Sequence, residues 1–218
     1  MKKEQIIQAM EQTGLIPVFS HADVETVKNV LDCAYEAGIR VFEFTNRTEN
    51  AVEVFTELAR YKQKYPDMIL GTGTVFDEET AIRFYKAGAQ FLVSPACIPE
   101  IAHLANKKDI LYIPGCGTVT EVFEALKMGA SLIKIFPANV LGPAFAKAVK
   151  SVLPQVKIMP TGGVLPNAEN LQLWFSSGVS CVGMGSQLFD KNLVQNRNYE
   201  MLTHSIQDTL QIVKTIRS

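Results

Sequence analysis

Apolar residues follow two alternating spacings along the chain. Short runs of mostly β-branched, aliphatic and aromatic residues are each followed by a longer segment in which apolar residues recur every three or four positions. The short runs predict strands that are buried on both faces, and the longer segments predict amphipathic helices. Glycine follows several of the predicted helices, as at Gly38, Gly88 and Gly178, where it favours the end of a helix.

This pattern predicts strands and helices in strict alternation. The predicted strands are 15–19, 39–44, 68–72, 89–94, 110–113, 131–136, 156–159 and 179–182. The predicted helices are 3–13, 24–37, 48–64, 78–87, 98–106, 118–128, 143–153, 167–177 and 199–216.

The alternation predicts an α/β fold with parallel strands. Eight strand–helix units predict a single (β/α)₈ TIM barrel with an extra N-terminal helix. The alternative is an open doubly wound sheet, which usually has fewer strands and a G-x-G-x-x-G turn that this chain lacks after its first strand. Because no linker or low-complexity segment divides the chain, we expect one domain over residues 1–218.

Composition excludes several classes of function. The formal net charge is −1 without a long basic run, so we expect no nucleic-acid partner. Because no apolar run approaches the length of a membrane span and no signal peptide is visible, we expect a cytoplasmic protein without a membrane partner. The cysteines show no C-x-x-C spacing and the histidines no metal-ligand spacing, which predicts free thiols and no metal site.

Lys134 is the most unusual residue of the pattern, because it lies in the middle of an apolar strand. It shares a strand face with Leu132 and Phe136, where an ammonium must be paired or neutral, and a neutral lysine amine is a nucleophile. Glu43 shares a face with Val41 in the second strand, so the two groups meet if both faces line the barrel interior. A purely structural Glu–Lys ion pair is the alternative.

Polar and glycine-rich turns follow the carboxyl ends of the predicted strands, where the active site of a barrel lies. The turns at 161–163 and 183–186 follow strands seven and eight, where barrels commonly bind phosphate. The Ser186 hydroxyl adds a hydrogen-bond donor. Arg47 follows the second strand, and its guanidinium suits a bidentate carboxylate. His21 and Cys116 also lie on this side, and we expect them only to line the site.

Several of these segments together resemble one known family. They are VFEFTNRT (41–48), GTGTV (71–75), SP (94–95), KIFPA (134–138) and PTGG (160–163). In this order they resemble the 2-keto-3-deoxy-6-phosphogluconate / 4-hydroxy-2-oxoglutarate aldolase family, from the first strand to the eighth. The resemblance implies a class I (Schiff-base) aldolase of carbohydrate metabolism. It also implies a TIM barrel, no metal or cofactor, and a homotrimer.

The resemblance also implies roles for individual residues. Lys134 would form the Schiff base with the substrate and Glu43 would act as general acid and base. The pyruvate part would be held by Arg47, Thr74, Pro95 and Phe136. The phosphate would be bound by Thr161, Gly162, Gly163, Gly185 and Ser186. The expected reaction is cleavage of a 2-keto-4-hydroxy acid to pyruvate and an aldehyde, either glyceraldehyde 3-phosphate or glyoxylate.

The chain departs from the family's usual pattern at three places. Ser20-His21 stands where many members carry an arginine, and Asn46 replaces a residue that is often apolar. The loop after the fifth strand reads GCGT (115–118), where Ser or Ala is more usual at one or more of the four positions. All three concern the aldehyde half of the substrate, whose identity stays open. The alternatives are a related keto-acid aldolase with a different aldehyde partner, a phosphate-binding barrel isomerase or epimerase, and a non-catalytic barrel that binds a phosphorylated metabolite.

Overall fold

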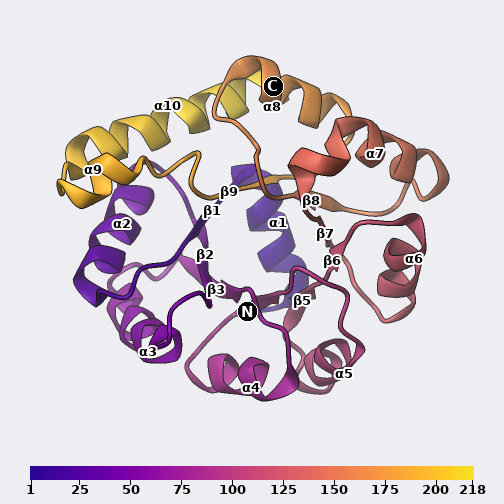
Figure 1. Cartoon of the computed structure of the whole chain (residues 1–218), viewed down its shortest axis with the longest axis horizontal. Coiled ribbons are helices and arrows are strands. Elements are labelled where there is room, and N and C mark those ends of the chain that lie inside the picture. Colours follow the sequence, from indigo (N-terminus) through magenta and orange to yellow (C-terminus); the bar gives the residue numbers. More distant parts are fainter.

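The computed structural model describes residues 1–218 and has its strands at the centre, with helices around them (Figure 1). The predicted α/β class is confirmed. The strands are β1 Leu15–Phe19, β2 Val41–Thr45, β3 Ile69–Gly73, β4 Phe91–Val93, β5 Leu111–Ile113, β6 Gly115–Cys116, β7 Ile133–Ile135, β8 Ile158–Pro160 and β9 Val182–Met184.

The helices follow the strands in the predicted order. They are α1 Lys3–Thr13, α2 Val24–Glu36, α3 Ala51–Tyr61, the 3₁₀ turn η1 Lys62–Lys64, α4 Glu78–Lys86, α5 Pro99–Lys108, α6 Val119–Lys127, α7 Ala138–Val152, α8 Ala168–Ser176, α9 Lys191–Gln195 and α10 Tyr199–Arg217. None of these helices combines the length and the apolar character that crossing a membrane requires.

All strand pairings are parallel. One sheet has the order β5-β4-β3-β2-β1-β9 and a second has the order β6-β7-β8. Pro114 alone separates β5 from β6, and a bridge between Thr161 and Gly183 joins the end of β8 to β9. The carboxyl ends of the parallel strands therefore lie on one side of the molecule, where the polar turns follow them.

Polar side chains fix the starts of the helices that follow several of these turns. Asp23 accepts a hydrogen bond from Thr26 N (3.0 Å), and Asp77 accepts one from Thr80 N (2.7 Å). Such caps satisfy backbone N–H groups that have no partner within the helix. Each helix consequently begins directly after the loop that leaves its strand, which keeps the loops short.

The two faces of the strands pack into different apolar clusters. Phe42 and Leu70 belong to the larger cluster, which lies between strands and surrounding helices. Val41 and Ile69 point the other way and belong to a smaller cluster that also contains Ile6, Ile7 and Met10 of α1. Since Val41 and Ile69 are the first residues of their strands, α1 closes the amino-terminal side of the strand interior, and Figure 1 shows it behind the strands.

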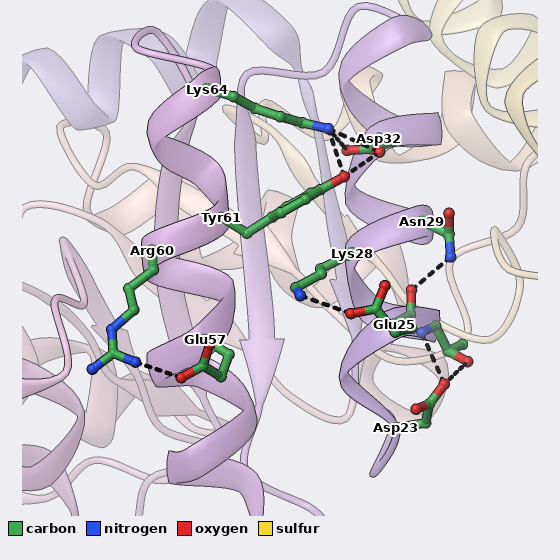
Figure 2. A network of polar contacts seen from close by, with 10 residues as sticks. Asp23, Glu25, Lys28, Asn29, Asp32, Glu57, Arg60, Tyr61 and Lys64 are labelled. Atoms are coloured by element: carbon green, nitrogen blue, oxygen red, sulfur yellow. Dashed lines mark hydrogen bonds and ion pairs between the residues drawn. The ribbon is translucent and has the colours of Figure 1, made fainter.

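A polar network joins α2 to α3 on the outside of the fold (Figure 2). Asp32 of α2 accepts hydrogen bonds from the hydroxyl of Tyr61 (2.6 Å), from Lys64 Nζ (3.1 Å) and from the hydroxyl of Tyr65 (3.1 Å). Because three donors converge on one carboxylate, the network orients two neighbouring helices relative to each other.

Apart from small shifts of element ends, the structure differs from the sequence-based elements at four places. The last strand, β9, is Val182–Met184 instead of 179–182, because Gly183 and Met184 pair with Ile16 and Pro17 of β1 rather than forming a turn. Residues 115–116 form strand β6 instead of a loop, because Gly115 and Cys116 pair with Lys134 and Ile135. Helix α7 begins at Ala138 rather than at Pro143, with a break at Gly142, whose φ is 73°. Helix α9 was not predicted, because five residues are too few to show a helical repeat.

Shortening Met10 to alanine tests the contribution of α1. Met10 is fully buried in the smaller cluster, so Met10→Ala should lower the free energy of unfolding by about 2 to 5 kcal/mol in urea denaturation. Gln8→Ala, at an exposed position of the same helix, should change it by less than about 0.5 kcal/mol. Equal effects of the two changes would contradict a closing role for α1.

Candidate active site

Glu43 and Lys134 lie on the strand face that packs against α1, closer to the carboxyl ends of the strands. Glu43 of β2 follows Val41 by two residues, and Lys134 of β7 follows Leu132 by two residues. Val41 and Leu132 both belong to the smaller cluster. Because strand side chains alternate, Glu43 and Lys134 point into the same interior. Their predicted meeting is confirmed, with Lys134 Nζ 3.7 Å from Glu43 Oε1.

The pair is almost completely shielded from solvent. Glu43 is 0% exposed and Lys134 is 4% exposed. Neither carboxylate oxygen of Glu43 has a hydrogen-bond partner in the chain, and 3.7 Å is too long for a hydrogen bond to the lysine. Most buried polar atoms in proteins are hydrogen-bonded. The Glu43 carboxylate is thus free to accept protons or hydrogen bonds from a bound molecule.

Burial raises the pKa of Glu43 above its ordinary value of 4.5, while the positive charges of Lys134 and Arg47 partly oppose this rise. Burial acts in this direction because it disfavours the charged form of a carboxyl group. A carboxyl group whose two protonation states are closer in free energy at neutral pH is better suited to give and take a proton within one reaction cycle.

Gly73 leaves the space that the Glu43 carboxylate occupies. A methyl group on Gly73, the last residue of β3, would overlap Glu43 Oε1. Gly73 pairs with Thr45 on β2, so the carboxylate leans from its own strand across the neighbouring one. The orientation of Glu43 therefore depends on the absence of a side chain at position 73.

A cavity of about 690 Å³ opens at the carboxyl ends of β1, β2, β8 and β9. Phe136 lines this cavity, and the centroid of its ring lies 5.4 Å from Lys134 Nζ. Phe136 thus connects the buried pair with the cavity. The predicted site residues that line the cavity are Arg47, Phe136, Thr161, Gly162, Gly163, Gly185 and Ser186.

Four predicted site residues do not line the cavity wall. Lys134 and Glu43 are buried, whereas Thr74 and Pro95 are half-buried at the ends of β3 and β4. Thr74 has a φ of 63°, in the left-handed region that residues with a side chain rarely adopt. This conformation turns the chain sharply where it leaves β3, directly after Gly73.

Two loops surround the part of the cavity that carries free backbone donors. Gly162 and Gly163 have φ values of 99° and 76°, which a side chain would strain. The loop is held by hydrogen bonds from Ala138 N to Thr161 O (2.9 Å) and from Asn139 N to Gly162 O (2.8 Å). After β9, Gly185 O accepts hydrogen bonds from Leu188 N (2.9 Å) and Phe189 N (3.2 Å), which close a turn that contains Ser186. Both loops face the same cavity.

His21 and Cys116 occupy different environments. His21 lines the cavity, and its Nδ1 accepts a hydrogen bond from Asp23 N (3.0 Å). In the neutral ring the proton is therefore on Nε2, which points away from Asp23 N. Cys116 is buried and does not line the cavity, so its predicted place at the site wall is wrong. Burial raises the pKa of the Cys116 thiol, which keeps it protonated.

Lys191, Gln195 and Arg197 also line the cavity, and the sequence interpretation had not singled them out. They lie in or just after α9, which was not predicted. The sequence feature that could have indicated α9 is Asp190, a residue type that favours the start of a helix. Its side chain caps α9 by accepting hydrogen bonds from Asn192 N (2.7 Å) and Leu193 N (3.2 Å). The structure contains no group of three or more His, Cys, Asp or Glu side chains that could hold a metal ion.

The family described as "KDPG and KHG aldolase" matches residues 6–205 of this chain. The chain belongs to this family. It is therefore a class I aldolase, a carbon–carbon lyase, as the sequence resemblance predicted. The matched region runs from α1 into α10 and therefore contains every strand of the fold.

Related aldolases cover nearly the whole chain. The 2-dehydro-3-deoxy-phosphogluconate aldolase of Treponema pallidum is 34% identical over 95% of this chain and 97% of its own length. The KHG/KDPG aldolase of Escherichia coli K12 is 30% identical, with 92% of each chain covered. The KDPG aldolase of Legionella pneumophila, solved with pyruvate captured as a covalent carbinolamine, superposes with a TM-score of 0.86 at 30% identity, covering 96% and 98% of the two chains.

Substituting Gly73 tests whether this aldolase depends on the orientation of Glu43. In Gly73→Ala the new methyl group displaces the Glu43 carboxylate, so turnover of the aldolase substrate should fall at least about a hundredfold, the scale of a misplaced catalytic group. In Gly117→Ala the nearest atom would lie 3.6 Å from the added methyl group, so turnover should stay within about twofold. Steady-state kinetics of both purified variants provide the comparison, and an active Gly73→Ala enzyme would contradict the dependence.

Proposed function

We propose that this aldolase cleaves 2-dehydro-3-deoxy-6-phosphogluconate, 4-hydroxy-2-oxoglutarate or both, giving pyruvate and either glyceraldehyde 3-phosphate or glyoxylate. Lys134 is the residue that forms the Schiff base, and Glu43 moves the protons. The observation that carries the proposal is the buried Lys134–Glu43 pair, whose carboxylate has no hydrogen-bond partner, next to a cavity with loops suited to an anion.

The geometry of the pair argues against a purely structural ion pair. Burying two charges is offset only when the geometry is close and further hydrogen bonds satisfy the remaining atoms. Here the two groups are 3.7 Å apart, and both Glu43 oxygens lack hydrogen bonds within the chain. An arrangement that is poor for stability is well suited to a ligand, because the substrate supplies the missing partners.

The proposed reaction begins with attack of the neutral Lys134 amine on the C2 carbonyl of the keto acid. The resulting carbinolamine loses water and becomes an iminium, whose positive charge draws electrons from the C3–C4 bond. Loss of the C4 hydroxyl proton then breaks this bond, which releases the aldehyde and leaves an enamine on Lys134. Protonation of the enamine at C3 and hydrolysis release pyruvate and restore the amine. The iminium is the electron sink, so the proposal includes no cofactor.

Glu43 has the position and the shifted pKa for these proton transfers. As an acid it helps the carbinolamine hydroxyl to leave as water, and as a base it accepts the C4 hydroxyl proton, directly or through a water. The same carboxyl group then returns a proton to the enamine carbon. Its raised pKa supports this role, because a carboxylate whose charged form is disfavoured by burial takes up a proton more readily than an exposed one.

The remaining site residues are proposed to orient the substrate. Arg47 holds the keto-acid carboxylate, with Thr74, Pro95 and Phe136 around the pyruvate part. The backbone N–H groups of the 161–163 and 185–186 loops, with the hydroxyls of Thr161 and Ser186, bind a phosphate. The cavity wall supports this assignment, because Arg47 and both loops line the same space.

The two sheets are proposed to form one closed (β/α)₈ barrel and one domain. Two observations support this. The chain passes from β5 to β6 through the single residue Pro114, which cannot donate to a ladder and so interrupts a strand without ending it. The Thr161–Gly183 bridge then links β8 to β9, beside a hydrogen bond from Ser180 N to Ile158 O (2.9 Å).

A cytoplasmic homotrimer acting in carbohydrate metabolism is the setting that we propose for the enzyme. The free cysteines, three of them buried, support a reducing compartment. The trimer is what the family resemblance implies. Exposed apolar side chains such as Phe76, Phe123 and Val140 offer surface for association between copies.

Trapping the covalent intermediate tests the assignment of Lys134. Incubation with pyruvate and borohydride should leave a carboxyethyl group on Lys134, found by mass spectrometry after digestion, because borohydride reduces the iminium to a stable amine. Lys134→Arg should give no adduct, whereas Lys157→Arg, at a partly exposed lysine, should give the full amount. An adduct at another lysine would exclude Lys134 as the nucleophile.

The pH dependence of activity tests the role of Glu43. Since its pKa is raised, the acid limb of kcat/KM should lie above pH 4.5, and activity should be lost as the pH falls through the pKa of the free enzyme and Glu43 takes up a proton. Glu43→Gln should lose at least about a hundredfold in kcat, the usual scale of general acid–base catalysis, and should still form the pyruvate adduct slowly. The exposed Glu78→Gln should retain the parental profile.

A further inference from the structure

The cavity wall holds more positive charge than the proposed reaction uses. Arg47, Lys191 and Arg197 line it, and Asp23 is the only carboxylate that does. None of the three cationic side chains makes an ion pair or a hydrogen bond within the chain. Nine other lysines and arginines do have carboxylate partners within 4.0 Å. Three unpaired cations facing one cavity indicate an anionic ligand with more than one charged group.

Asp23 does little to neutralise this charge. Its Oδ2 accepts hydrogen bonds from Thr26 N (3.0 Å) and Thr26 Oγ1 (2.6 Å) at the start of α2. These bonds lower the pKa of Asp23, so its negative charge is engaged by the amino-terminal end of that helix. The other three charged side chains remain available to a bound molecule.

Local hydrogen bonds fix the backbone of the segment that carries Lys191 and Arg197. Lys191 is the first residue of α9, which Asp190 caps. Arg197 has a φ of 54°, a strained conformation that hydrogen bonds from Arg197 N to Val194 O (3.1 Å) and from Asn198 N to Leu193 O (2.9 Å) maintain. The turn that follows α9 thus keeps Arg197 at the cavity, although glycine or asparagine would adopt this backbone more easily.

The two cations and the 161–163 loop belong to different elements around the cavity. In Figure 1, α9 lies beside α2, and β8 lies on the other side of β1 and β9. A molecule that fills the cavity is therefore bordered both by the 161–163 loop and by the segment that carries the two cations. Arg47, near the end of β2, remains for the carboxylate of the keto acid.

We propose that Lys191 and Arg197 bind the anionic end of the aldehyde half and make this aldolase select substrates with a phosphate ester over their uncharged counterparts. This inference rests on the proposed function. A phosphate dianion has enough oxygens to accept hydrogen bonds from the loops and from both cations together. A substrate of the same carbon skeleton with a free hydroxyl gains nothing from the two charges, so the cations act on selectivity and leave the chemistry at Lys134 to other residues.

Selectivity is measured as a ratio of two kcat/KM values, for 2-dehydro-3-deoxy-6-phosphogluconate and for the same acid without its phosphate. Lys191→Gln and Arg197→Gln should each lower this ratio about tenfold, mainly through KM of the phosphorylated acid, because each removes one charge-assisted contact. The double variant Lys147→Gln/Lys214→Gln removes two exposed cations that do not line the cavity and should leave the ratio unchanged. An unchanged ratio in both cavity variants would overturn the proposal.

A binding measurement separates this proposal from the proposed reaction. Calorimetric titration with glycerol 3-phosphate should give an affinity about tenfold lower for Lys191→Gln or Arg197→Gln than for the parent, and the Lys147→Gln/Lys214→Gln control should bind like the parent. Equal affinity of parent and cavity variants would overturn the role of the two cations. Loss of keto-acid cleavage in the parent, with the expected binding differences intact, would overturn the proposed reaction alone.

Discussion

The shielding of Glu43 and Lys134 from water is the constraint on which the rest of the structure depends. Removing a charged group from water costs several kcal/mol even after the protein relaxes, and an ion pair at 3.7 Å without further hydrogen bonds offsets only part of that cost. The apolar clusters on both faces of the strands supply the stability that permits it. Gly73 provides the space for the carboxylate, and Phe136 borders both the pair and the open cavity.

Sequence patterns predicted the order of the strands and most helices, because burial imposes regular spacing on long segments. They also predicted that Lys134 and Glu43 meet, since a charged residue on an apolar strand face stands out. Helix α9 was missed because five residues show no period. Lys191 and Arg197 were missed for a different reason. The sequence does not distinguish a lysine or arginine at a cavity from one elsewhere on the surface. Only the folded chain shows that these two lie at the cavity.

The two ends of the strands differ in what their residues contribute: packing at one end and the candidate site at the other. At the amino-terminal end, Ile6, Ile7 and Met10 of α1 fill the interior, so this end contributes to stability. At the carboxyl end, glycines and polar residues replace the apolar side chains, and backbone conformations with positive φ occur at Thr74, Gly162 and Gly163. The division permits the loops and α9 to vary in sequence without disturbing the packing that holds Lys134 and Glu43.

The closure of the strand interior by α1 also has a consequence for the order of events. With one end filled by side chains, molecules reach Lys134 and leave it only through the cavity side. In the proposed reaction pyruvate stays covalently attached to the deeper residue while the aldehyde lies nearer the opening. The aldehyde therefore departs first and pyruvate last, and in the synthetic direction pyruvate must enter before its partner. Access from one side only therefore agrees with an ordered release of products and an ordered binding of substrates.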